Sequence, residues 1–170
     1  YFGAYRFHKN IERLIEAYAL LDTSLRKKYK LVLTKEHPNL VRQIEKYNFQ
    51  DDVRFIGFVS EGDKPFILKM ASIVYYASLY EGFGVPIIES QAAGTPVITS
   101  IVSSLPEAAG NAAALVDPYN ADDICHAIER ILEDDVYTKK IITDGFVNSY
   151  CYTWERSVDE FVRALAHIGY

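Results

Sequence analysis

The 170-residue chain has few cysteines and no long uninterrupted apolar segment. Cys125 and Cys151 are too few and too widely spaced for a metal-binding motif or a disulfide framework. A protein that makes no use of disulfides fits a reducing compartment, so we expect a cytoplasmic location. No apolar run is long enough to cross a bilayer.

An excess of basic residues is also lacking. The chain carries 18 Lys and Arg against 23 Asp and Glu, which gives a net charge of −5. Binding to nucleic acid needs a basic face, so we expect no nucleic-acid partner. The histidines are scattered and none has metal-ligand spacing, so we expect no metal site: they are His8, His37, His126 and His167.

Short apolar segments alternate with segments of helical periodicity along the whole chain. We expect six strands, at residues 1–4, 30–34, 53–59, 72–78, 96–100 and 113–116. We expect helices at residues 11–21 with Asn10 as N-cap, then at 38–47, 63–70, 86–93, near 106, 122–132, 137–150 and 154–168. The pattern predicts an α/β fold with a doubly wound, Rossmann-like parallel sheet and a C-terminal helical extension, as one domain over residues 1–170.

A doubly wound sheet binds ligands where its strand order reverses. With the order 3-2-1-4-5-6, the loops at residues 3–10 and 78–84 border that crevice. The first loop carries Arg6 and Lys9 just before a helix N-terminus, which suits a phosphate, although both are also ordinary surface charges in many proteins.

The second loop opens the stretch "SLYEGFGVPIIESQAAGTPVI", in which Glu81 and Glu89 stand eight residues apart. Pro86 suits the first turn of a short helix, and Gly94 suits its C-terminal end. We therefore expect Glu89 in the first turn of that helix, with both carboxylates facing the crevice. A solvated loop acid and an acid favoured by the helix dipole are the alternatives.

The residues between the two acids suit a close approach of ligand to backbone. Gly82 and Gly84 leave their N–H groups uncovered, unless they merely form a tight turn. Cations and backbone amides bind a diphosphate, and carboxylates accept hydrogen bonds from the hydroxyl groups of a ribose or a hexose. A nucleotide sugar has both parts, so it fits best. NAD fits less well because "GAYRFHKN" lacks two glycines of G-x-G-x-x-G, but Glu36 after the second strand keeps it open.

The stretch "SLYEGFGVPIIESQAAGTPVITS" resembles the signature of the retaining, nucleotide-sugar-dependent glycosyltransferases of group 1, also called family 4. "YFGAYRFHKNIERLIEAYALL", "VRFIGFVSEGDK", "SSLPEAAGNAAALVDPYNADDICHAIERILED" and "YTWERSVDEFVRAL" are similar to other segments of the same family, in the same order. The resemblance implies half of a GT-B fold. The chain would be the donor-binding domain, and the acceptor domain would precede Tyr1.

The resemblance also implies roles for particular positions. Glu81 would lie against the donor sugar and take part in catalysis, Glu89 would bind the ribose hydroxyls, and Lys9 would bind the diphosphate. The backbone of Gly82, Phe83, Gly84 and Val85 would wrap the sugar and the diphosphate, and Phe58 and Val59 would flank the base.

Two segments depart from the family pattern. Ala4 stands where the family often has an arginine, and Arg6 is expected to reach the same phosphate instead. In "TKEHP", Lys35 and His37 stand where glycines are common, which puts contacts from that turn in doubt.

The implied reaction is transfer of a hexosyl group, with retention, from a nucleoside-diphosphate sugar to an acceptor hydroxyl in polysaccharide, lipopolysaccharide or glycoconjugate biosynthesis. No cofactor or metal is expected. A carbohydrate or glycolipid acceptor, and any peripheral membrane contact, would involve the preceding domain, and the isolated donor domain would be weakly active or inactive. The alternatives are a glycoside-processing hydrolase with paired carboxylates, a non-catalytic nucleotide-sugar-binding module, and an epimerase or phosphorylase of related fold.

Overall fold

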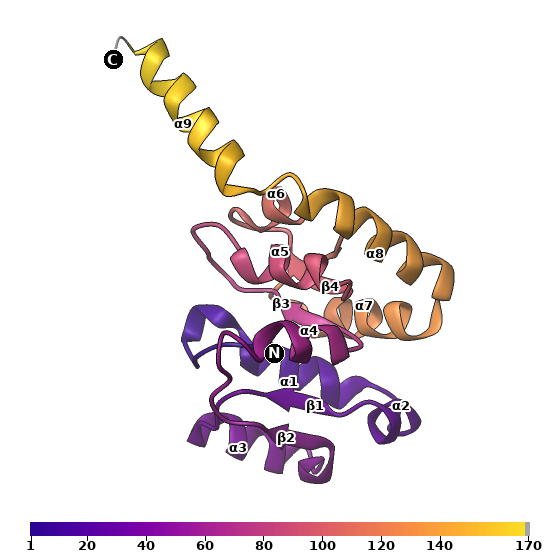
Figure 1. Cartoon of the computed structure of the whole chain (residues 1–170). Helices are drawn as coiled ribbons and strands as arrows, with labels where there is room; N and C mark the ends of the chain where they lie inside the picture. The colour runs from indigo at the N-terminus through magenta and orange to yellow at the C-terminus, as the bar shows by residue number, and fades with distance from the viewer. Residues whose placement is uncertain (169–170) are drawn as a thin grey trace.

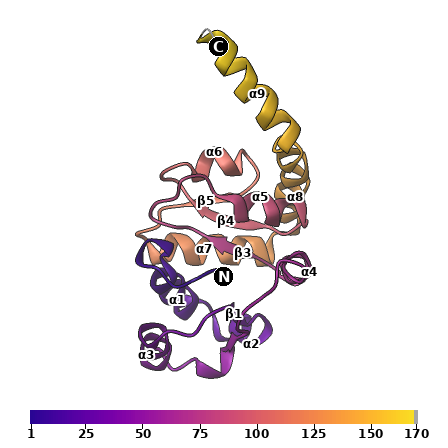
Figure 2. The same ribbon diagram turned by 60° about the vertical axis from the view of Figure 1, so that its left-hand side comes forward.

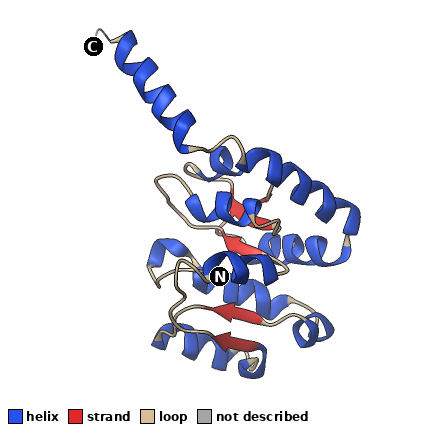
Figure 3. Ribbon diagram, viewed as in Figure 1, coloured by secondary structure: helices blue, strands red, loops and turns tan. Residues whose placement is uncertain are grey.

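The computed structural model describes residues 1–168 and has parallel strands flanked by helices on both faces (Figures 1 and 3). The strands are β1 (Leu31–Leu33), β2 (Val53–Phe55), β3 (Val74–Tyr76), β4 (Val97–Ser100) and β5 (Ala114–Val116). The helices are α1 (Ile11–Leu20), α2 (Thr23–Lys28), α3 (Pro38–Lys46), α4 (Lys64–Met70), α5 (Val85–Ala92), α6 (Leu105–Ala109), α7 (Ala121–Glu133), α8 (Asp135–Ser149) and α9 (Trp154–His167). Two 3₁₀ turns, η1 (Phe7–Lys9) and η2 (Gln50–Asp52), complete the described elements. The α/β class predicted from the sequence is confirmed.

The strands form two parallel sheets. β1 pairs with β2, with Leu31 opposite Val53, and β3, β4 and β5 pair in that order, with Tyr76 opposite Thr99. All residues of β3 and β4 are buried, as expected for strands covered on both faces.

The prediction of a strand over residues 1–4, and of a six-stranded sheet, is wrong for the described chain. The amine of Tyr1 donates to the carbonyl of Val32 at 2.8 Å, and the N–H of Gly3 to Oγ1 of Thr34 at 3.0 Å. The segment therefore runs beside β1, but Gly3, at φ +138°, turns the chain away before a ladder forms. An apolar cavity of about 330 Å³ remains between the sheets.

Successive residues of β3 point into two different apolar cores. Tyr75 belongs to the larger core with residues of α1 and α7, and Tyr76 belongs to a smaller core with residues of α5 and α6. Figure 2 shows α1 and α7 on one side of the three-stranded sheet and α5 and α6 on the other. This alternation places the Tyr76 side chain on the same side of the sheet as α5.

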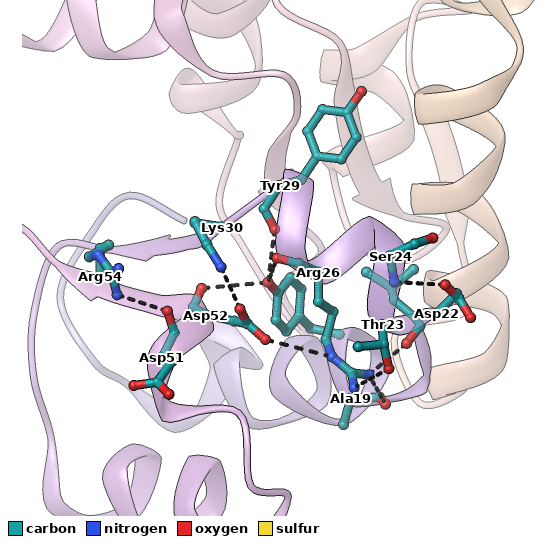
Figure 4. Close-up of polar contacts among 12 residues, drawn as sticks. Ala19, Asp22, Thr23, Ser24, Arg26, Tyr29, Lys30, Asp51, Asp52 and Arg54 are labelled. Carbon is teal, nitrogen blue, oxygen red and sulfur yellow. Dashed lines mark hydrogen bonds and ion pairs between the residues drawn. The ribbon is translucent and has the colours of Figure 1, made fainter.

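Helix α2 was not predicted. Asp22 ends the apolar stripe of α1, but its carboxylate accepts from the N–H of Ser24 at 2.7 Å and caps a new helix. Close by, the carboxylate of Asp52 pairs with Lys30 and lies 3.9 Å from Arg26 (Figure 4). These contacts join α2 to the chain just before β1 and β2, at the amino ends of the strands.

The C-terminal helical extension is confirmed as α9, which projects away from the rest of the described chain (Figures 1 and 2). None of its residues is buried, and Trp154, Val158 and Phe161 are exposed on it. No helix within residues 1–168 combines the length and apolarity needed to cross a membrane.

Candidate functional site

The two loops predicted to border the crevice meet beyond the carboxyl end of β3. The N–H of Leu79 donates to the carbonyl of His8 at 2.7 Å. Asn10 adds a second link, because its side-chain amide donates to the carbonyls of Ala77 at 3.1 Å and Pro118 at 2.7 Å. Asn10 is the N-cap residue of α1, as predicted, but its side chain makes no capping bond. The side chain ties three loops together instead.

Lys9 and Glu81 form an ion pair between these loops. The ammonium of Lys9 lies 2.5 Å from Oε1 of Glu81 and 2.7 Å from the hydroxyl of Tyr76. The two charged side chains are only 19% and 14% exposed, so solvent screens the pair weakly. The sequence had assigned Lys9 and Glu81 to facing loops, and the structure brings them into contact.

The surroundings of Glu81 favour its charged form. Burial alone would raise its pKa, but the hydrogen bond and charge of Lys9, with the nearby hydroxyls of Ser78 and Tyr76, outweigh burial and hold the pKa of Glu81 below its usual value. The pKa of the Tyr76 hydroxyl is raised, first by burial and then by the neighbouring Glu81 carboxylate. Glu81 is therefore ionised at neutral pH, and Tyr76 is a neutral phenol.

The sequence predicts Glu89 in the first turn of α5, but in the structure it lies in the second turn. The helix begins one residue before Pro86, at Val85, which places Glu89 fifth. An acid in the second turn gains little from the helix dipole, so the dipole does not explain why an acid stands at position 89. Its Oε1 instead lies 2.6 Å from the ammonium of Lys64 on α4, and its Oε2 is buried without a partner among the described residues.

The two glycines of the loop have different roles. Gly84 has φ +121°, and a Cβ placed on it would lie 3.0 Å from Leu105 Cδ2 and 3.1 Å from Ile87 Cδ1, so both backbone and packing require glycine. A Cβ on Gly82 would meet nothing within 4 Å. Within residues 1–168, the N–H groups of Gly82, Phe83 and Gly84 donate to no protein acceptor, as predicted for an uncovered backbone.

Two serines before α6 hold the same loop from the other side. The hydroxyl of Ser103 donates to the carbonyl of Glu81 at 2.7 Å and accepts from its N–H at 3.2 Å. The hydroxyl of Ser104 lies 3.0 Å from the carbonyls of Glu81 and of Phe83. The carbonyls are thereby turned toward α6, which leaves the amides between them for another partner.

Four predicted residues lie outside this network. Arg6 is exposed and makes no ion pair within the described residues. Phe58 is 94% exposed, and together with Val59 it lies in the loop beyond β2, because that strand ends at Phe55 rather than at Val59 as expected. Val85 is exposed at the first position of α5.

Sequence reasoning did not identify Tyr76, Lys64, or the loop partners Ser103 and Tyr152. In the sequence, Tyr76 is one of several apolar residues of a buried strand, and Lys64 is a charged residue of a largely exposed helix. Neither position therefore suggests a part in a ligand site. The ring of Tyr152, from the turn between α8 and α9, packs edge-on against Phe83 with centroids 5.5 Å apart. Only the fold reveals these contacts.

The donor set at this site suits an anionic, hydroxyl-rich ligand. Lys9 and the three amides offer hydrogen bonds to an anion, and the two carboxylates accept hydrogen bonds from hydroxyl groups. Over residues 1–168 no three His, Cys, Asp or Glu side chains gather where they could hold a metal ion.

Comparison with known proteins gives consistent matches. The family model of the group 1 glycosyl transferases matches residues 1–146. The chain is 33% identical over 168 residues to O-antigen chain mannosyltransferase B of Escherichia coli, covering 96% of this chain and 44% of that relative. The chain thus spans less than half the length of this relative.

Solved structures share the fold. The C-terminal domain of a group 1 family protein (LpcC) from Francisella tularensis matches with TM-score 0.73 and 26% identity, covering 86% of this chain and 80% of that one. HepE of Anabaena, solved with UDP and glucose, matches with TM-score 0.85 and 20% identity, covering 98% and 47%.

Proposed function

The chain belongs to the group 1 glycosyl transferases, and on this basis we propose that it forms the donor-binding half of an enzyme that transfers a hexosyl group from a nucleoside-diphosphate sugar. The observation that carries the proposal is the Lys9–Glu81 pair at 2.5 Å beside three uncovered amides. A cation, free amides and an ionised carboxylate in one place match a diphosphate joined to a polyol.

Lys9 and the amides of Gly82, Phe83 and Gly84 bind the diphosphate in this proposal. Preorganised donors stabilise the charge that develops on a leaving diphosphate, and they do so without a metal ion or other cofactor. Arg6 lies on the same loop and supplies longer-range positive charge. Because Gly84 is fixed by packing, the amides do not need to be ordered when the ligand binds.

Glu81 is the catalytic group in the proposal. Its carboxylate is ionised and anchored by Lys9, so it lies against the transferred sugar and stabilises the positive charge that develops at the anomeric carbon. Retention at that carbon is inferred from the family and is part of the proposal. Glu89, whose side chain is 31% exposed, accepts from the ribose hydroxyls, while Lys64 holds its Oε1.

Phe58 and Val59 flank the base, and the exposed ring of Phe58 offers a stacking surface. The donor assignment is supported by HepE, whose structure holds UDP and glucose. The mannosyltransferase of Escherichia coli acts on an O-antigen chain, which supports a carbohydrate or glycolipid acceptor. The acceptor half would lie outside the 170 residues of this chain.

Ligand-induced stabilisation tests donor binding. The chain is heated with UDP, GDP, ADP, their hexose conjugates and NAD in separate wells, and the matching donor raises the melting temperature because it binds only the folded state. K9M should lose this shift. A chain stabilised by NAD, or by none of these diphosphates, would contradict the proposal.

Transfer itself is tested in the full-length protein. E81Q should abolish hexosyl transfer while leaving nucleoside-diphosphate binding largely intact, because Gln keeps the volume and removes the charge. Transfer by E81Q at the wild-type rate would refute the catalytic role. Donor binding without transfer in the wild type would instead identify a non-catalytic nucleotide-sugar module.

A further inference from the structure

Tyr76 is the third member of the Lys9–Glu81 cluster and has no role in the proposed reaction so far. Its hydroxyl lies 2.7 Å from the Lys9 ammonium, which also sits over the tyrosine ring at 4.9 Å from the centroid. The residue is 5% exposed, and the main-chain carbonyl of Tyr76 accepts from the hydroxyl of Thr99 at 2.9 Å. Tyr76 is therefore fixed on β3, whereas Lys9 and Glu81 lie in loops.

The hydrogen-bond inventory sets the direction of each bond. A lysine ammonium has three donors and no acceptor, so the Tyr76 oxygen accepts from Lys9. The phenol proton of Tyr76 is then free for another acceptor, and the Glu81 carboxylate, which Lys9 also binds, lies in the same cluster. Lys9 donates to Tyr76 and to Glu81, and one of its three N–H groups remains free.

We propose that Tyr76 is a positioning residue for the donor diphosphate. It anchors Lys9 and Glu81 to β3, so that the remaining N–H of Lys9 points toward the anion. The proposal rests on the proposed function of the site. In this proposal the Tyr76 hydroxyl holds the flexible Lys9 side chain in one conformation before the donor binds.

The alternative is that Tyr76 is an ordinary core residue. Its ring does belong to the smaller core with Ile87 and Leu105. A core residue needs only the ring, however, and burying a phenol hydroxyl is unfavourable unless it is hydrogen-bonded. Here the side chain that is hydrogen-bonded to that hydroxyl, within the described residues, is Lys9.

The test compares Y76F with Y18F, which removes the hydroxyl of another buried tyrosine, one that donates to the carbonyl of Tyr29 near the amino end of β1. Binding of inorganic pyrophosphate, UDP, GDP, uridine and guanosine is measured by titration calorimetry. Y76F should weaken pyrophosphate and the matching nucleoside diphosphate about tenfold, the usual effect of losing a hydrogen bond to a charged group. Nucleoside affinity should not change, and Y18F should bind every probe like the wild type.

A double-mutant cycle with K9M completes the test, because an effect exerted through Lys9 disappears once Lys9 is absent. Y76M is the second variant if Y76F does not fold, since it also removes the hydroxyl and fills an apolar site. Unchanged diphosphate affinity in Y76F would overturn the positioning role alone. An equal loss for nucleosides would show a merely structural role, and a wild type that binds no diphosphate would overturn the proposed function as well.

Discussion

The ammonium of Lys64 lies 2.6 Å from Oε1 of Glu89, and this pair connects the first turn of α4 to the second turn of α5. Burial alone would lower the pKa of Lys64, but the hydrogen bond and charge of Glu89 outweigh it, and the net pKa is raised. Both acids of the loop are therefore paired with a lysine from another segment. The site therefore pairs each of these carboxylates with an ammonium group before any ligand is present.

K64M should destabilise the chain by about 1 kcal/mol, because Glu89 is left as a partly buried charge without its partner. Urea unfolding monitored by circular dichroism measures the change. K69M on the same helix is the matched control, since Lys69 is exposed and should change stability by less than about 0.5 kcal/mol. Equal stability of K64M and K69M would show that the pair contributes nothing.

G84A should destabilise the chain by about 1–3 kcal/mol, because φ is +121° there and the new methyl group would press on Leu105 and Ile87. G82A has open space around its Cβ and should stay within about 0.5 kcal/mol of the wild type. The two variants are compared by urea unfolding. The prediction fails if G82A is the less stable variant.

D52N should lower stability by about 1 kcal/mol by weakening the contacts of Asp52 with Lys30 and Arg26. The cluster lies at the amino ends of β1 and β2, so the melting-temperature shift produced by the matching nucleoside diphosphate should be unchanged. D51N is the control, because the contact recorded for Asp51 with Arg54 uses the Asp51 carbonyl rather than its side chain. Loss of the ligand-induced shift in D52N would contradict the separation of this cluster from the site.

The lowered pKa of Glu81 predicts an acid-dependent contribution to stability. A carboxyl whose folded pKa lies below its unfolded value stabilises the fold above the unfolded pKa, here 4.5, and loses that contribution as pH falls through the folded value. E81Q should therefore be less stable than the wild type at pH 6, and the difference should shrink on acidification to pH 3. Urea unfolding at both pH values measures it, with E45Q on exposed α3 as control. A constant difference between E81Q and wild type would refute the prediction.

The sequence determined the fold class and most of the elements, because hydrophobic period and helix punctuation are local properties. Pro86 and Gly94 correctly delimited α5, since proline suits a first turn and Gly94 adopts φ +76° just beyond the helix. The sequence also placed Lys9 and Glu81 on loops that meet, because the carboxyl ends of parallel strands share one edge.

Tertiary structure alone decided which side chains pair. Tyr76 and Lys64 have ordinary local explanations in the sequence, and their partners, Lys9 and Glu89, lie in other segments. Asn10 spans three loops because its backbone adopts φ +59°, which a helical pattern does not indicate. Contacts between distant segments depend on how elements pack, so the sequence by itself supplied the acids and the cation of the site, and the fold supplied the residues that hold them in place.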